Sequence, residues 1–172
     1  MNSLTLENAA TALPPRRWGL RLVLIALAII EVWIGLSDVT ALFGDTAIGS
    51  GLGGLLVKTH LAAHPVLAVV ALVSAGIGRI RIAIVALGAA ILLAWLNDMP
   101  SVVSHGLEFK STFSAVETIA RIVAFPLIAA CAIADAARGE HLGRATLLVA
   151  APTLFNMVLL VGFFVSVMIH GF

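Results

Sequence analysis

The amino-acid sequence predicts an all-α integral membrane protein, built as a bundle of five transmembrane helices. The 172 residues are 61% hydrophobic and 11% charged, whereas soluble domains are about 25% charged. Five apolar stretches are each long enough to cross a bilayer, which takes about 20 residues. No polar stretch between them is long enough to bury a core, so we expect no separate soluble domain.

The first span, residues 18–37, follows directly after Arg16 and Arg17. Its apolar run is longer than the 7–15 residues that are typical of a signal-peptide core, and no small-residue cleavage site follows it. We therefore expect a retained first helix, preceded by a flexible cytoplasmic tail at residues 1–17. Residues 18–172 would then form one transmembrane domain.

Four further spans follow, separated by stretches rich in glycine and proline that are typical of turns. Pro65, Pro126 and Pro152 fall inside spans, where neighbouring helices can satisfy the carbonyl groups that a proline leaves free. The predicted spans after the first are residues 54–77, 81–99, 113–135 and 146–170.

The distribution of lysine and arginine predicts the orientation. Seven arginines lie at the ends that share a side with the N-terminus, against two lysines, Lys58 and Lys110, at the opposite ends. Because cytoplasmic loops carry the excess of basic residues, we expect the N-terminus in the cytoplasm and the C-terminus outside. We expect the chain in the inner (plasma) membrane, in contact with the lipid bilayer.

A weak internal repeat relates the first and third spans. A shift of about 60 residues places Arg21 on Arg81 and Asp38 on Asp98, and a shift of 61 places His60 on Arg121. The repeat predicts two similar helical hairpins with a fifth helix added, and would bring His60 near Arg121. The alternative is a chance alignment of helices rich in alanine and leucine.

His60 and His64 are four residues apart and therefore share one face of a helix. This spacing suits two ligands to one metal ion, with a carboxylate such as Glu117 completing the set. One of these histidines could instead hold haem b with a histidine from another helix. A purely structural alternative is that both hydrogen-bond to neighbouring helices.

Glu117 and Arg121 repeat this spacing, in the order that favours a helical ion pair. The pair could neutralise itself and fix helix packing. Arg121 could instead bind an anionic ligand or cofactor group, because its planar guanidinium offers a fork of donors.

Glu31 lies inside the first span without a cation on its own helix. It must pair with His60, His64 or Arg121 from another helix, or stay protonated in the low-dielectric interior. A carboxyl group that changes between these states is typical of a proton relay, and Glu117 and Arg121 could take part. We expect the five polar residues inside the spans to lie one or two helical turns below the outer face: Glu31, His60, His64, Glu117 and Arg121. Asp38, Asp98 and His105 would be solvated at that face.

Three functional hypotheses follow, and none requires catalytic activity of the chain itself. The leading one is a small membrane subunit that holds a haem, a metal ion or a quinone for redox chemistry. The second is an oligomeric ion- or proton-coupled transporter. The third is a non-catalytic assembly subunit that packs against other membrane subunits or copies of itself. The net charge of +1 and the scattered basic residues argue against nucleic-acid binding.

Overall fold

The computed structural model describes residues 15–44, 51–107, 109 and 112–170, and every regular element among them is a helix. Five helices are long and apolar enough to cross a membrane, which confirms the predicted all-α architecture. The helices are α2 (Pro15–Phe43), α3 (Gly51–Gly76), α4 (Ile80–His105), the continuous run of α5 (Thr112–Ile119), η1 (Ala120–Ala124) and α6 (Phe125–Arg138), and α7 (Leu142–His170).

The helices are longer than the predicted spans, mainly at one end of the bundle. Helix α2 continues to Phe43, and α4 passes through Pro100 to His105, where the sequence had suggested a turn. The turn predicted after residue 99 is wrong, because a membrane helix tolerates a proline such as Pro100 where its neighbours satisfy the carbonyl group left free. Residues 1–14 of the predicted tail lie outside the described residues, and 15–17 belong to α2.

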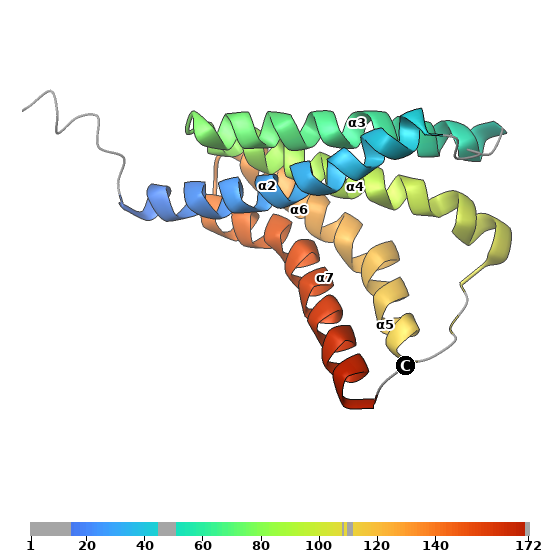
Figure 1. Cartoon of the computed structure of the whole chain (residues 1–172). Coiled ribbons are helices and arrows are strands. Elements are labelled where there is room, and N and C mark those ends of the chain that lie inside the picture. Colours follow the sequence, from blue (N-terminus) through green and yellow to red (C-terminus); the bar gives the residue numbers. More distant parts are fainter. Residues whose placement is uncertain (1–14, 45–50, 108, 110–111, 171–172) are drawn as a thin grey trace, which may run out of the picture.

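The five helices gather at one end of the bundle and diverge at the other (Figure 1). Helices adjacent in sequence pack side by side, α2 on α3, α3 on α4, α4 on α6 and α6 on α7, while α7 and α5 lean away from α3. We call the gathered end the arginine end. It is defined by Arg21, Arg79, Arg81, Arg138 and Arg144.

Small residues make the core of the bundle. Twelve of the eighteen buried hydrophobic residues in the described chain are alanines, among them Ala71, Ala83 and Ala132. A Cβ on Gly88 of α4 would come within 2.7 Å of Ile133 on α6, so the glycine allows these two helices to pack closely. Such contacts are typical of membrane helices, whose association depends on close packing because lipid tails are as apolar as leucine.

Candidate functional site

A polar cavity of about 350 Å³ lies between all five helices, close to the middle of their length. The helices extend further at this end than the spans predicted from sequence. The cavity brings together four of the five predicted polar residues. Its polar lining consists of Glu31, His60, His64, Asp98, Arg121, Thr153 and Asn156.

One face of α2 forms the first wall of the site. Glu31, Gly35 and Asp38 are spaced four and three residues apart, which places them on the same side of a helix. At Gly35 the helix meets Pro65 of α3 so closely that a Cβ would lie 3.0 Å from the Pro65 Cα. This glycine therefore sets the crossing of α2 over α3, with one carboxylate on each side of it.

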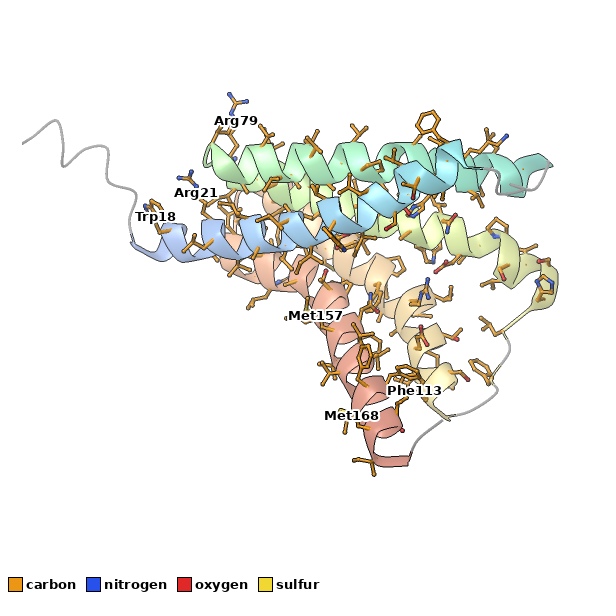
Figure 2. All side chains as sticks on the ribbon, viewed as in Figure 1. Trp18, Arg21, Arg79, Phe113, Met157 and Met168 are labelled. Carbon is orange, nitrogen blue, oxygen red and sulfur yellow. The ribbon has the colours of Figure 1, made fainter. Side chains whose placement is uncertain are left out.

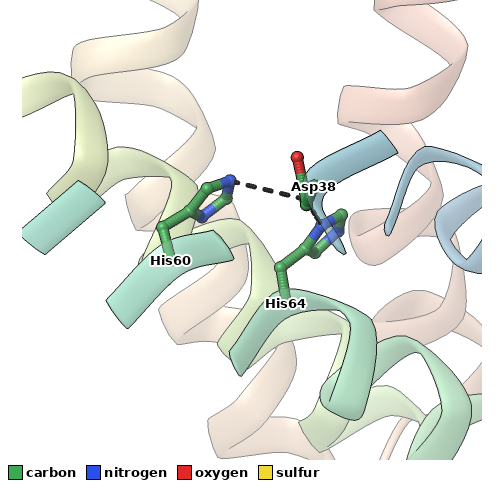
Figure 3. A group of neighbouring side chains, drawn as sticks. All are labelled: Asp38, His60 and His64. Carbon is green, nitrogen blue, oxygen red and sulfur yellow. Dashed lines mark hydrogen bonds and ion pairs between the residues drawn. The ribbon is translucent and has the colours of Figure 1, made fainter. Parts of the chain in front are cut away.

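His64 lies between these two carboxylates. Its Nδ1 is 2.5 Å from Asp38 Oδ2 and its Nε2 is 3.1 Å from Glu31 Oε2 (Figure 3 shows the Asp38 contact). The side chain is buried, and Thr153 Oγ1 of α7 donates a hydrogen bond to the other Glu31 oxygen at 3.2 Å. A continuous chain of polar contacts thus joins α7, α2 and α3.

The two contacts of His64 limit how many protons His64, Glu31 and Asp38 can share. A neutral imidazole has one N–H, and a carboxylate only accepts hydrogen bonds. For both contacts of His64 to be hydrogen bonds, either the ring or one of the two carboxyl groups must carry an additional proton. A proton or another cation can therefore bind in the site formed by Asp38, Glu31 and His64.

His60 stacks on His64, with ring centroids 5.3 Å apart and planes inclined by 7°. Its Nε2 is 4.0 Å from Asp38 Oδ2, too long for a hydrogen bond, and its buried Nδ1 has no partner among the described residues. The ligand atoms of Asp38, His60 and His64 all lie within 4.8 Å of one another. Two imidazoles and a carboxylate at this separation are a donor set for a transition-metal ion.

Arg121 faces the same cavity and contacts two carboxylates. Its Nη2 is 3.0 Å from Asp98 Oδ2, and its Nη1 is 3.5 Å from Glu117 Oε1. The predicted Glu117–Arg121 pair is present, but the closer partner is Asp98 of α4. With its guanidinium directed at two carboxylates, Arg121 has less capacity to bind an external anion.

A proline explains the local conformation of the helix that carries Arg121. Pro126 has no N–H for the Ile122 carbonyl four residues earlier, and Phe125 instead bonds to Ala120, giving the π-helical segment η1. The freed Ile122 carbonyl accepts a hydrogen bond from Trp95 Nε1 at 3.0 Å. This cross-helix bond ties α4 to the helix on which Arg121 sits.

Glu117 does not join the histidines. It lines a second cavity of about 480 Å³, which we call the side pocket, together with Ser101 and His105. Asp98 and Arg121 line both cavities and so form the wall between them. The carboxylate closest to the two histidines is therefore Asp38, where the sequence had suggested Glu117.

Sequence reasoning missed Asp38 and Asp98, which were expected to be solvated. Both are mostly buried, with side chains 18% and 24% exposed. The spacing from Glu31 to Asp38 could have revealed the first, once α2 is extended beyond residue 37. The chain has no match among known protein families, curated proteins or solved structures.

Proposed function

We propose that this chain is a small membrane subunit that holds a transition-metal ion between Asp38, His60 and His64, in support of redox chemistry. The observation that carries the proposal is the cluster of three ligand atoms within 4.8 Å, one of which belongs to a histidine without a hydrogen bond. A buried polar group left unsatisfied in a protein calls for an explanation, and an ion is one of the few available.

The surroundings of His64 also suit a metal ligand. Histidines that bind metals almost always donate their other ring N–H to a carboxylate, a backbone carbonyl or water, which orients the ring. In this site Nδ1 faces Asp38 and the proposed ion, while Nε2 faces Glu31. Three protein ligands would leave one position of a four-coordinate ion free for a further small ligand.

The donor set limits which ions are expected. Nitrogen and carboxylate donors suit Zn²⁺, Cu²⁺ and Fe²⁺, whereas Mg²⁺ and Ca²⁺ prefer oxygen donors alone. Haem b is supported less well than an ion, because it would need a histidine from another helix opposite His60 or His64. His105 of α4 lines the side pocket and not the polar cavity. A quinone is also supported less well, since Arg121 is already paired.

A second candidate is ion transport, in which the metal is the cargo. The observation that favours it is the line of polar side chains that continues from the histidines to Asp98 and Arg121 and on into the side pocket. In either case the proposal places the chain in the plasma membrane. Exposed apolar residues along the second half of α7 would face lipid, further subunits or copies of the chain.

Metal binding to the purified full-length protein in mild detergent tests the proposal. After treatment with a chelator, Zn²⁺ or Cu²⁺ is titrated and the bound metal is measured by elemental analysis. We expect about one ion per chain in the wild type and none in a His60→Ala/His64→Ala variant. Glu31→Gln should weaken binding by about 10–100-fold, since it removes the carboxylate that orients His64.

His141→Asn is the matched control, because His141 is an exposed histidine outside both cavities. Its backbone has a φ of 46°, a conformation that asparagine tolerates and alanine does not. Equal metal content in the control and the double-alanine variant would contradict the proposal. Metal uptake into proteoliposomes that requires His60 and His64 would favour transport over a resident cofactor.

A further inference from the structure

A third cavity, separate from the polar cavity and from the side pocket, lies at the arginine end. It has a volume of about 370 Å³ and lies between α2, the α3–α4 turn, and the ends of α6 and α7. Arg21, Arg79 and Arg81 all line it, together with Ile80, Ile82 and Leu142. No acidic residue lines it among the described part of the chain. We call it the arginine pocket.

The three arginines lack carboxylate partners in the described structure. Arg21 donates to the Gly76 carbonyl and packs over the Trp18 ring at 5.3 Å, while its buried Nε has no partner. Arg79 and Arg81 are exposed, and neither makes an ion pair with a described residue. Figure 2 shows Trp18, Arg21 and Arg79 at the same end of the bundle.

The nearby acidic residues do not neutralise this charge. Asp135 is paired with Arg144, whose Nε lies 3.0 Å from Asp135 Oδ2. Glu140 is exposed in the turn after α6 and does not line the pocket. The pocket therefore concentrates positive charge that the described chain leaves uncompensated.

Two features of the backbone also favour an anion at the arginine pocket. Ile80, Arg81 and Ile82 form the first turn of α4, where the N–H groups have no carbonyl within the helix and the helix dipole favours an anion. Gly139 ends α6 with a φ of 73°, and a Cβ there would overlap the Arg81 guanidinium. This glycine thus leaves room for the arginine beside the pocket.

We propose that the arginine pocket binds the phosphate of an anionic phospholipid. The pocket lies at the ends of apolar, membrane-length helices, the level at which lipid headgroups are found. Basic pockets between helices at this level recognise anionic headgroups. The arginines would contact the phosphate, and the apolar residues Ile80, Ile82 and Leu142 would contact the glycerol and upper acyl chains.

Lipid selectivity of the purified full-length protein tests this proposal. The protein is exchanged into nanodiscs of phosphatidylcholine with about one-fifth phosphatidylglycerol of the same acyl chains, and retained lipid is counted by native mass spectrometry. We expect the wild type to retain phosphatidylglycerol preferentially. Arg79→Gln and Arg81→Gln should each reduce this preference about fivefold, and the double variant about 30-fold.

Arg138→Gln is the matched control, since Arg138 is an exposed arginine at the same end that does not line the pocket. It should keep the preference, and circular dichroism should show that every variant remains helical. An unchanged preference in Arg79→Gln and Arg81→Gln would overturn the proposal. Binding of inorganic phosphate at these residues, without any preference among lipids, would overturn the lipid assignment in favour of a soluble anion.

Discussion

Arginine is used in opposite ways in the polar cavity and in the arginine pocket. Arg121, in the middle of its helix, contacts the carboxylates of Asp98 and Glu117. Arg79 and Arg81, at the end of the bundle, contact no carboxylate of the described chain. A charge at mid-helix must be compensated inside the protein because hydrocarbon offers no partner. A charge at the helix end can be compensated by water or by lipid headgroups.

The same comparison explains why the two sites suit different ligands. Glu31 and Asp98 line the polar cavity, and Asp38 contacts His64, which also lines it. These three carboxylates face one arginine and two histidines, so they can accommodate a cation. The arginine pocket has three guanidinium groups and no lining carboxylate among the described residues, so it suits an anion.

The largest expected effect is at His64. His64→Ala leaves Glu31 and Asp38 without their shared partner, which should lower the free energy of unfolding of the metal-free protein by about 3 kcal/mol. The loss should fall in the lower part of the range for a broken buried pair, because both carboxylates are nearly one-fifth exposed. His60→Ala should cost much less, since His60 makes no hydrogen bond with a described residue. Denaturant unfolding of the metal-free variants measures both values. Equal losses would show that the two histidines share one structural role.

Gly35→Ala tests whether the crossing of α2 and α3 assembles the polar cavity. The added Cβ would lie 3.0 Å from the Pro65 Cα, so α2 and α3 must separate by a few tenths of an ångström. This separation should cost about 1–3 kcal/mol, which the better helix propensity of alanine offsets by up to about 1 kcal/mol. Metal binding should weaken as α2 and α3 separate, while lipid preference at the arginine pocket should not change. Gly162→Ala is the control, because a Cβ there meets nothing within 4 Å and alanine favours the helix. A Gly35→Ala protein as stable as this control would contradict the close crossing.

The smallest expected effects come from replacing an arginine by glutamine in the polar cavity and in the arginine pocket. Arg121→Gln leaves two carboxylates without their cation and should cost about 1 kcal/mol, a modest value because the Arg121 side chain is 47% exposed. Arg79→Gln removes no internal pair and should shift the melting temperature in detergent by no more than about 1–2 °C. Thermal unfolding of both variants measures the difference. If Arg79→Gln were the more destabilising, the contrast between the regions would be lost.

The arrangements within one helix could be predicted from the sequence. His60 with His64 and Glu117 with Arg121 depend only on a spacing of four residues, and the structure brings both pairs together. The pairing of Glu31 could be narrowed to three candidates, because a carboxylate inside an apolar span needs a partner from another helix. The structure places it against His64.

What the sequence alone determined is the set of five membrane-length helices and the polar residues inside them, because hydropathy and helical spacing are local properties. Only the tertiary structure decided that Asp38 contacts His64 and that Asp98 lines the polar cavity. It also decided that Arg79 and Arg81 share a pocket with Arg21. These groupings depend on where helices cross. The crossing of α2 and α3 depends on contact between Gly35 and Pro65, residues 30 positions apart, which no local pattern encodes.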